Sequence, residues 1–452
     1  MNIDLQSSLQ KHFGFANFRP GQLEAIQNLL NGQHTLVVMP TGSGKSLVFQ
    51  LAALHLPGIT LVISPLVALM KDQVDSLMRR GIAATFINST LPTSEQNRRL
   101  KDFAAGKYRL VYVAPERLRS VQFLEAMKHQ KCSLLAVDEA HCISEWGHDF
   151  RPDYLRIAQF RAGLGYPLTA ALTATATPQV QDDIARLLNL PKVRPVVTGF
   201  NRPNLVLEVR NITDQTGRLK ALQELLSDHG EGAAIVYTGT RRDAEEVAEF
   251  LRVVVGVPAE HYHAGLPTDE RTRIQDMFMS GRLSLISATN AFGMGIDRAD
   301  VRQVIHYSIP GSLEAYYQEA GRAGRDEFPA KAVLLYSPED RALQEWFIDS
   351  SALTREDLTV LYEALRPISD NQGYTTLEKL SLLTRQHEVK VKVGLAELEH
   401  AGMLVHLGDQ GLRVRVRLHA WKAAEIQKIA EKIKLHQEHR RAQLSSMINY
   451  AE

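Results

Sequence analysis

Short apolar runs that alternate with amphipathic stretches constrain the fold of this chain more than any other feature of its sequence. Each run is bounded by Gly, Pro or Ser and is followed by a stretch with helical periodicity, as over residues 66–79. The runs lie at residues 35–38, 60–63, 84–87, 110–113, 134–137 and 168–172. A parallel sheet covered by helices has this pattern, because its strands are buried on both faces. We therefore expect an α/β domain over residues 1–204.

The same alternation restarts further along the chain. Its apolar runs lie at residues 233–237, 283–288, 304–307 and 332–336. They predict a second α/β domain of the same type over residues 205–350. Residues 199–204 contain Gly, Asn and Pro, which are the turn-forming residues expected of a joint between two domains.

From about residue 351 the pattern changes to three helical stretches followed by two short strands. The helical stretches are at residues 355–365, 376–383 and 388–401, and the strands at 403–406 and 412–417 flank a turn at 408–411. Helices followed by a hairpin resemble a winged helix, a fold that often contacts duplex DNA. We expect such a domain over residues 351–419 and a C-terminal helix over residues 420–452. A small helical scaffold without a nucleic-acid role is the alternative.

The composition excludes several classes of protein. A chain of 452 residues with 44% hydrophobic and 23% charged residues is too long for one ordinary domain and too apolar for disorder. No apolar run approaches the roughly 20 residues of a membrane span, and no charged-then-apolar leader opens the chain. Two cysteines, Cys132 and Cys142, cannot form a disulfide framework or a four-cysteine zinc site, so we expect a reducing cytoplasm and no support for zinc. With a net charge of +1, any basic surface must be local.

Residues 39–46 read MPTGSGKS and separate an apolar run from a helical stretch. Glycines in such a loop let backbone N–H groups turn towards a phosphate, and the lysine reaches the terminal phosphates. Met39 stands where the usual pattern has its first glycine. A lone Gly-Lys-Ser occurs often by chance, so the surroundings decide its meaning. The candidate nucleotide-binding residues of the loop are Thr41, Gly42, Ser43, Gly44, Lys45 and Ser46.

Two further motifs supply the remaining chemistry of a phosphoryl-transfer site. Asp138 and Glu139 end a later apolar run, where the aspartate and Ser46 would hold Mg²⁺ and the glutamate would activate the attacking water. Arg322 and Arg325 lie three residues apart in the second α/β domain, on one face if helical, and could reach a γ-phosphate across an interdomain cleft. Each motif alone also fits an ordinary structural interpretation. The acidic pair could be a solvated strand end, and the arginines could be a surface charge patch. Their joint occurrence predicts a catalytic set of Lys45, Asp138, Glu139, Arg322 and Arg325.

In their order along the chain, these motifs resemble those of superfamily 2 helicases, whose phosphate loop commonly lacks its first glycine. Two longer segments resemble the RecQ family of DNA helicases. Residues 13–22 (FGFANFRPGQ) resemble its adenine-recognition segment, which implies that Phe15 and Arg19 sandwich the base and Gln22 binds its edge. Residues 142–154 (CISEWGHDFRPDY) resemble its aromatic-rich loop. There Trp146 and Phe150 offer stacking faces and Arg151 a cation for DNA.

Shorter matches occupy the rest of the two α/β domains. Residues 64–73 and 114–118 resemble strand-tracking motifs, and residues 173–177 resemble the segment that links hydrolysis to lobe movement. Residues 289–297 resemble a motif of the second lobe, in which Thr289 would contact a DNA phosphate and Asp297 the ribose of the nucleotide. The resemblance is strong over residues 1–340 and weaker over residues 351–452.

The resemblance implies two RecA-like domains and an ATP- and Mg²⁺-dependent DNA helicase that moves 3′ to 5′ on single-stranded DNA and unwinds duplex in repair and recombination. The implied partners are single-stranded DNA, forked or branched DNA and a single-strand-binding protein, with no membrane. The implied location is the cytoplasm, in association with a bacterial nucleoid. An RNA helicase of the same superfamily is the rival enzyme, since the Asp-Glu-Ala-His box alone would permit it. A DNA-binding switch, in which ATP only sets affinity, is the rival from another class.

The end of the chain departs from the RecQ pattern. RecQ proteins usually carry a four-cysteine zinc module after the second lobe, and this chain has no such cysteines. Residues 438–452 resemble the helix that leads into that module, so we expect that the chain stops just before it through truncation. Residues 412–452 contain nine Lys or Arg and four acidic residues, an excess of five positive charges. These charges could contact phosphates or could line a solvated helix face.

Overall fold

The computed structural model describes residues 3–65, 67–88, 91–144, 146–147, 149–227, 232–293, 296, 298–370, 373–410 and 413–452. The chain divides into two compact units, one comprising Met1–Asp340 with Asn449–Glu452 and the other Arg341–Ile448. The first unit holds two parallel sheets, which we call the first and second lobes. The predicted domain boundaries at residues 204, 350 and 419 stay predictions.

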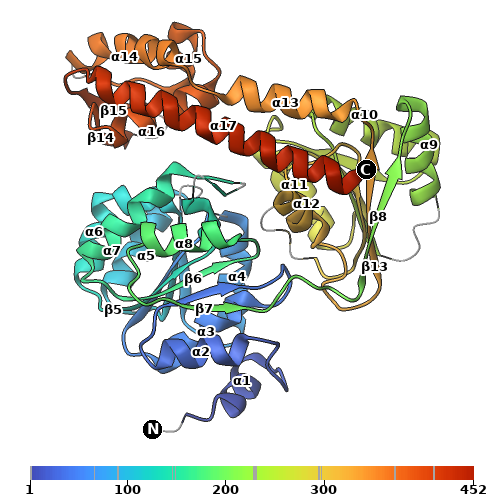
Figure 1. Ribbon diagram of the computed structural model, residues 1–452. Helices are drawn as coiled ribbons and strands as arrows, with labels where there is room; N and C mark the ends of the chain where they lie inside the picture. The colour runs from blue at the N-terminus through green and yellow to red at the C-terminus, as the bar shows by residue number, and fades with distance from the viewer. Residues whose placement is uncertain are drawn as a thin grey trace. The chain divides into compact units, whose positions relative to one another are not determined.

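A seven-stranded parallel sheet forms the first lobe, coloured blue to green in Figure 1. Its strand order is β3-β4-β2-β5-β6-β1-β7. The strands are β1 (Thr35–Val38), β2 (Ile59–Ile63), β3 (Ala84–Ile87), β4 (Leu110–Val113), β5 (Cys132–Val137), β6 (Leu168–Thr173) and β7 (Arg194–Val197). The helices are α1 (Leu5–Phe13), α2 (Gln22–Leu30), α3 (Lys45–His55), α4 (Val67–Arg79), α5 (Thr93–Ala104), α6 (Val121–Lys128), α7 (Ile157–Gly163) and α8 (Pro178–Leu187), with short 3₁₀ turns η1 (Pro115–Arg119), η2 (Ala140–Ile143) and η3 (Pro152–Arg156).

Successive side chains of a strand point to opposite faces of the sheet, and this alternation builds two cores in the first lobe. Val37 packs in the core that helices α1 to α4 cover, whereas Leu36 and Val38 pack in the core that helices α5 to α8 cover. All four residues of β1 are buried. The apolar run therefore reflects burial on both faces, as the sequence predicted.

A six-stranded parallel sheet forms the second lobe, with strand order β10-β11-β9-β12-β13-β8 (Figure 1). The strands are β8 (Leu205–Asn211), β9 (Ala233–Tyr237), β10 (Ala259–Tyr262), β11 (Leu285–Ala288), β12 (Val301–His306) and β13 (Ala330–Tyr336). The helices are α9 (Gln215–Leu226), α10 (Arg241–Phe250), the π-helical η4 (Leu251–Val255), α11 (Thr268–Met279) and α12 (Leu313–Ala320). Helices α9 and α10 contribute to one core of this lobe, and α11 and α12 to the other.

The second unit contains the predicted helices and hairpin. It comprises α13 (Asp340–Ser351, whose first residue belongs to the first unit), α14 (Arg355–Asp370), α15 (Leu377–Thr384), α16 (Glu388–His400), β14 (Leu404–Gln410), β15 (Arg413–Leu418) and most of α17 (Ala423–Ala451). The two strands pair antiparallel and share a core with α14 to α17. The turn expected at residues 408–411 starts later, because β14 continues to Gln410 through an irregularity between His406 and Gly408; residues 411–412 are outside the described part.

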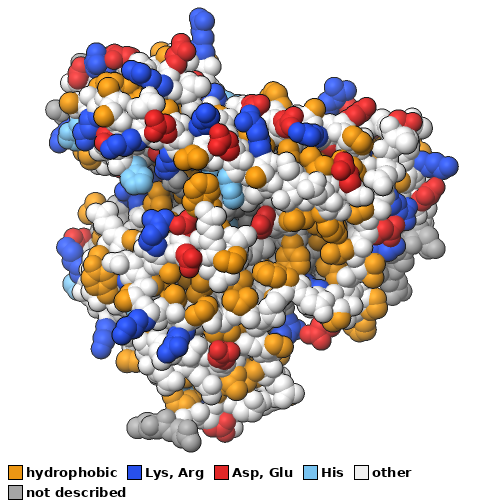
Figure 2. Space-filling view, in the orientation of Figure 1, with side chains coloured by type: hydrophobic (Ala, Val, Ile, Leu, Met, Phe, Trp, Pro, Cys, Tyr) orange, Lys and Arg blue, Asp and Glu red, His pale blue; other side chains and the backbone are white. Residues whose placement is uncertain are grey.

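Surface charge agrees with the balanced composition. Figure 2 shows acidic and basic side chains intermixed over the face drawn, in keeping with the net charge of +1. No described helix combines the length and the apolar composition that crossing a membrane requires.

Gly21 and Gly14 allow a matched test of packing at the start of α2. Both have a left-handed backbone, with φ of 78° and 77°. A Cβ atom at Gly21 would lie 2.4 Å from Thr198 Cγ2 and 2.7 Å from Met39 Cε, whereas a Cβ at Gly14 would meet nothing within 4 Å.

We expect Gly14→Ala to destabilise the protein by about 1–2 kcal/mol through backbone strain alone. Gly21→Ala should cost about 1–3 kcal/mol more, because its methyl group also overpacks the core. Urea denaturation of both variants measures the difference. Equal losses of stability in the two variants would show that the side chains of Thr198 and Met39 move to make room for the new methyl group.

Candidate active site

The phosphate loop connects β1 to α3 at the carboxyl edge of the first sheet. Gly42 and Gly44 have φ of 83° and 77°, a region that residues with a side chain rarely adopt. Gly44 is the N-cap of α3, and no side chain caps this end of the helix. The first N–H groups of α3 and the positive end of its dipole are therefore available to an anion.

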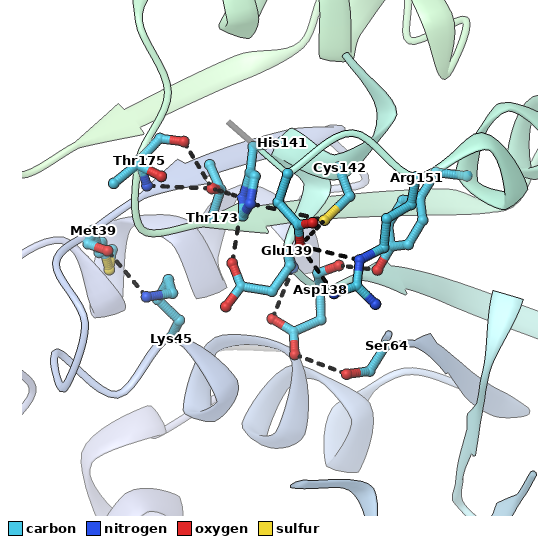
Figure 3. A network of polar contacts seen from close by, with 12 residues as sticks. Met39, Lys45, Ser64, Asp138, Glu139, His141, Cys142, Arg151, Thr173 and Thr175 are labelled. Atoms are coloured by element: carbon cyan, nitrogen blue, oxygen red, sulfur yellow. Dashed lines mark hydrogen bonds and ion pairs between the residues drawn. The ribbon is translucent and has the colours of Figure 1, made fainter. Parts of the chain in front are cut away.

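Lys45 is held at the start of the same loop. Its Nζ donates to the carbonyl oxygens of Met39 at 3.1 Å and Pro40 at 3.3 Å (Figure 3). Ser46 follows on the first turn of α3 and is half-buried. Ser43 Oγ is buried and has no hydrogen-bond partner within the described residues. An orphaned hydroxyl beside uncapped amides fits the phosphates of a nucleotide.

Asp138 follows β5, two strands away from β1 in the sheet, so it lies on the same carboxyl edge as the phosphate loop. Its Oδ2 accepts a hydrogen bond from Ser64 Oγ at 3.3 Å, and its Oδ1 accepts one from the Glu139 N–H at 3.1 Å. Burial, and then the negative charge of Glu139, raise the pKa of Asp138 to about 7, while the Lys45 ammonium opposes that rise. A buried acidic pair of this kind fits a divalent cation, which would stabilise the ionised form.

Glu139 adopts a left-handed backbone conformation, with φ of 47°. Its Oε2 lies 3.4 Å from His141 Nδ1 but is buried without a hydrogen bond among the described residues. His141 Nδ1 instead lies 2.8 Å from Thr173 Oγ1, and the Thr173 hydroxyl donates to the Thr175 carbonyl at 3.0 Å. This hydroxyl therefore accepts from His141 Nδ1–H, a tautomer that we assign from the hydrogen-bond network. The carboxylate of Glu139 keeps a free acceptor oxygen, and Figure 3 shows the chain of contacts.

The predicted adenine segment lies against the phosphate loop. Gln22 is buried; its Oε1 accepts from the Arg19 N–H at 2.9 Å, and its Nε2 donates to the carbonyls of Ser43 at 3.0 Å and Gly44 at 3.1 Å. Arg19 donates through Nη1 to the Gly42 carbonyl and pairs through Nη2 with Glu327 at 3.0 Å. Phe15 is half-exposed. The base contacts of all three residues stay predictions.

The two predicted arginine fingers occupy different environments. Helix α12 ends at Ala320, and residues 321–326 form turns, so the condition that both arginines share a helical face is not met. Arg325 lies against the phosphate loop, since a Cβ atom at Gly42 would be 3.2 Å from Arg325 Cγ. Arg322 is buried within the second lobe, where its Nη2 lies close to Gly293. Of the two, Arg325 is the one that approaches the nucleotide-binding loop.

Arg202, in the joint between the lobes, was missed as a functional residue. Its Nη1 donates to the carbonyls of Thr41 at 3.2 Å and Gly321 at 3.3 Å, and its Nη2 donates to those of Ala323 at 3.0 Å and Gly324 at 2.7 Å. One guanidinium thus binds the phosphate loop and the turn that carries both predicted fingers. No local pattern could reveal this role, because the partners lie up to 161 residues away in the sequence.

Asn204 binds the same turn from the other side of the joint. Its Nδ2 donates to the carbonyls of Gly324 at 2.8 Å and Phe328 at 2.9 Å. Gly324 has φ of 61°, and a Cβ atom there would lie 2.6 Å from Asn204 Nδ2. Two residues of the joint, Arg202 and Asn204, therefore hold the backbone of this turn.

The aromatic-rich loop follows the acidic pair and is attached to it. Tyr154 is buried and donates through Oη to the Asp138 carbonyl at 2.9 Å. Trp146 is half-buried and packs against the first-lobe core. Its backbone N–H donates to Ser144 Oγ at 3.2 Å. Arg151 donates to Asp149 Oδ2 through Nε at 3.0 Å and Nη2 at 2.9 Å. Phe150 is half-buried.

Two predicted residues remain in the second lobe. Thr289 follows β11 and is buried; its N–H donates to the Tyr262 carbonyl at 3.1 Å, and its Oγ1 accepts from the Ala291 N–H at 3.4 Å. Asp297 lies outside the described residues, so its predicted contact to the ribose stays a prediction.

Comparison with protein families identifies the class that this fold and site define. The family model described as DEAD/DEAH box helicase matches residues 19–184, and the one described as Helicase conserved C-terminal domain matches residues 217–327. The Lhr helicase of Mycobacterium smegmatis has the same fold, with a TM-score of 0.62 at 19% identity over 95% of this chain and 62% of that one. Dbp5 of S. cerevisiae gives a TM-score of 0.61 at 19% identity over 76% of this chain and 90% of that one. The two matched models and the shared fold are those of superfamily 2 helicases.

The sequence relatives narrow this class to one family. The ATP-dependent DNA helicase RecQ of Bacillus subtilis is 46% identical over 348 residues, which are 76% of this chain and 58% of that protein. The probable ATP-dependent DNA helicase RecS of the same organism is 40% identical over 408 residues, 90% of this chain and 79% of that protein. The chain belongs to the RecQ family of ATP-dependent DNA helicases. It spans 58% of the B. subtilis RecQ and 54% of the Haemophilus influenzae RecQ.

The free acceptor oxygen of Glu139 leads to the first prediction from this site. Glu139→Gln should leave ATP affinity within a few-fold of the wild type, because the amide is isosteric. ATP turnover should fall by roughly 10²–10⁴-fold, because the amide cannot take a proton from water. Nucleotide binding and steady-state hydrolysis, measured on one preparation, separate the two effects. Glu125→Gln, an exposed glutamate paired with Lys128, is the control. Loss of nucleotide binding in the Glu139 variant would make this residue structural.

Arg202→Lys tests whether the joint positions the turn that carries Arg325. Lysine keeps the charge but cannot bind four carbonyls with one planar fork. Misplacement of a reacting group by about 1 Å costs on the order of 10²-fold in rate, so kcat should fall much more than ATP affinity. Arg210→Lys is the matched control, since Arg210 pairs with Glu208 at 2.6 Å on β8. Equal losses of kcat and affinity, or losses as small as those of the control, would refute the positioning role.

Proposed function

We propose that this chain is the motor of an ATP- and Mg²⁺-dependent DNA helicase, which moves 3′ to 5′ on single-stranded DNA and separates the duplex ahead of it. The observation that carries the proposal is the approach of Arg325, from the second lobe, to Gly42 of the phosphate loop in the first. A site completed by residues of two lobes can couple the state of its nucleotide to their relative movement. A switch in which ATP only sets DNA affinity needs no repeated hydrolysis, and so has less need of such a residue.

Residues of the first lobe bind the substrate ATP and its metal. The uncapped amides of α3, with Thr41, Gly42, Ser43 and Gly44, hold the phosphates, and Lys45 exchanges its carbonyl contacts at Met39 and Pro40 for the β- and γ-phosphates. Ser46 and Asp138 would hold Mg²⁺, whose charge would offset that of the phosphates. Phe15, Arg19 and Gln22 contact the adenine, and Asp297 the ribose.

Glu139 and Arg325 carry the chemical step. The free Oε2 of Glu139 accepts a proton from the attacking water. The guanidinium of Arg325 stabilises the charge that develops on the transferring phosphoryl group. Arg322, buried in the second lobe, completes the site together with Arg325.

DNA acts on this site through the aromatic-rich loop. Trp146 and Phe150 stack on bases, Arg151 supplies positive charge, and Thr289 contacts a phosphate from the second lobe. Tyr154 joins the loop to the backbone of Asp138, and the contacts among His141, Thr173 and Thr175 extend from Glu139 towards the segment 173–177. Occupation of the loop by DNA can thereby shift the acidic pair.

The proposed track, domains, partners and location of this protein follow the RecQ family. The named RecQ relatives are DNA helicases, which favours DNA over RNA as the track. We assign four parts to the chain: a first lobe over residues 1–204, a second over 205–350, a winged-helix-like domain over 351–419 and a C-terminal helix over 420–452. Forked or branched DNA and a single-strand-binding protein are the proposed partners, at the nucleoid of a bacterial cytoplasm and in repair and recombination.

One set of assays separates the proposal from its rivals. ATP turnover should rise strongly with single-stranded DNA, less with duplex DNA and least with RNA. Duplexes with a 3′ single-stranded tail should be unwound and those with only a 5′ tail should not. Stimulation by RNA equal to that by DNA would favour an RNA helicase. DNA binding that depends on ATP without repeated hydrolysis would favour a switch.

Phe150→Ala tests the coupling to DNA most cleanly, because Trp146 also packs against the core. Loss of one stacked base, about 1–3 kcal/mol, should raise the DNA concentration for half-maximal stimulation roughly five- to hundredfold. Basal hydrolysis should persist, since Asp138 and Glu139 are unchanged, and the melting temperature should shift little. Trp146→Ala should lose both stimulation and stability.

Phe328→Ala provides the control for these two variants, because it removes an exposed phenyl ring from the second lobe. It should leave stimulation at the wild-type level. A Phe150→Ala variant that keeps full stimulation would remove this residue from the DNA contacts.

A further inference from the structure

Arg161, on α7, is a buried cation without a counter-charge. Its side chain is 1% exposed, and it donates to Thr169 Oγ1 through Nε at 2.9 Å and to the carbonyls of Leu188 at 3.4 Å and Asn189 at 2.9 Å through Nη1. Among the described residues, no carboxylate forms an ion pair with it. Burial lowers the pKa of Arg161, which reflects the cost of a charge removed from water.

The remaining group of Arg161, Nη2, faces another donor. It lies 3.1 Å from His34 Nε2, while the Thr169 N–H donates to His34 Nδ1 at 3.1 Å. Burial, and then the charge of Arg161, lower the pKa of His34, so the ring is neutral at neutral pH and carries one proton. Because Nδ1 accepts, we assign that proton to Nε2, which makes both of the nitrogens that lie 3.1 Å apart donors. Two N–H donors therefore meet, and no acceptor from the described part of the chain bridges them.

His34 and Arg161 both line a cavity. Its volume is about 490 Å³, within the range of about 300–1,000 Å³ that is typical of small-molecule sites. His34, Arg161, Tyr166, Arg186 and Asn189 are among its lining residues. The Tyr166 ring is 54% exposed, and its centroid lies 5.3 Å from Arg161 Cζ. Arg186 already pairs with Asp183 at 2.5 Å, so Arg161 is the uncompensated charge.

The cavity is separate from the ATP site. His34 directly precedes β1, and the phosphate loop directly follows the four residues of this strand. At about 3.3 Å per residue, the two sites lie at opposite ends of β1, roughly 13 Å apart along the strand. ATP bound at the phosphate loop therefore leaves the cavity free.

We propose that this cavity is a binding site for a phosphate group, either free or at the end of a small organic molecule. Oxygen atoms of the phosphate accept from His34 Nε2–H and Arg161 Nη2–H together, which removes the conflict between the two donors. Its negative charge also compensates the buried guanidinium, which a bridging water cannot do. The exposed face of Tyr166 provides an apolar wall for the organic part of such a ligand.

Calorimetric titration with inorganic phosphate tests this proposal, with the ATP site saturated by Mg²⁺ and a non-hydrolysable ATP analogue and the ionic strength held constant with chloride. The wild type should bind phosphate saturably. His34→Leu and Arg161→Lys should each bind it at least tenfold more weakly; His34→Leu keeps the test decisive if the Arg161 variant does not fold. Arg194→Gln is the matched control, since it removes an exposed positive charge next to β1 but lies outside the lining.

Phenyl phosphate distinguishes the two sources of the phosphate group. If the ligand is an organic phosphate, phenyl phosphate should bind more tightly than inorganic phosphate, and Tyr166→Asn should remove the difference. Asparagine suits the positive φ of 58° at this residue. Equal affinity for both probes would identify free phosphate as the ligand. The proposal is overturned if the wild type shows no saturable binding, or if the His34 and Arg161 variants bind as the wild type does.

Discussion

The guanidinium of Arg202 ties the chemistry of the two lobes together. It binds the Thr41 carbonyl in the phosphate loop and three carbonyls of the turn at residues 321–324. The position of Arg325 against Gly42 depends on that turn, because Arg325 directly follows Gly324 within it. A hydrogen bond between a charged donor and a carbonyl contributes about 1.5–3 kcal/mol, so four of them around one planar group define the turn closely. The contact to Thr41 is the one that relative movement of the lobes would break.

The sequence predicted the strands of both sheets except β7, β8 and β10. Apolar runs marked the central strands of both lobes and the edge strand β3, whose residues are all buried, and the structure confirms them. Strands β7, β8 and β10 were not predicted, and each lies at the edge of its sheet. Two of the missed strands are poorly covered: β7 has one buried residue in four and β8 has no fully buried residue, whereas the edge strand β3 is buried throughout. Without continuous burial the apolar run that marks a parallel strand is absent.

The candidate site also contains residues that the sequence predicted and residues that it did not. The phosphate loop and the acidic pair were found because each motif is continuous in the sequence and follows a buried strand. Arg202 and Asn204 were not found, since they act on backbone carbonyls more than 100 residues away. The separation of Arg322 from Arg325 also escaped prediction. Residues 321–326 form turns where helical spacing would have placed both arginines on one face.

Contacts around the acidic pair explain how one site can respond to two ligands. Asp138 is bound through its carbonyl to Tyr154 of the aromatic-rich loop, and Glu139 lies beside His141, which binds Thr173. The pair thus lies between the segment proposed to meet DNA and the segment proposed to follow lobe movement. Burial keeps these contacts in a medium of low dielectric, where small displacements change the energies of charged groups most.

Single-turnover hydrolysis by Arg325→Ala, with saturating single-stranded DNA and with ATP affinity measured on the same protein, shows whether the second lobe completes the site. The rate of hydrolysis should fall by roughly 10³–10⁵-fold, as for other arginine fingers, while ATP affinity should change far less. Equal losses of rate and affinity, or a rate close to that of the wild type, would contradict the claim that the second lobe completes the site.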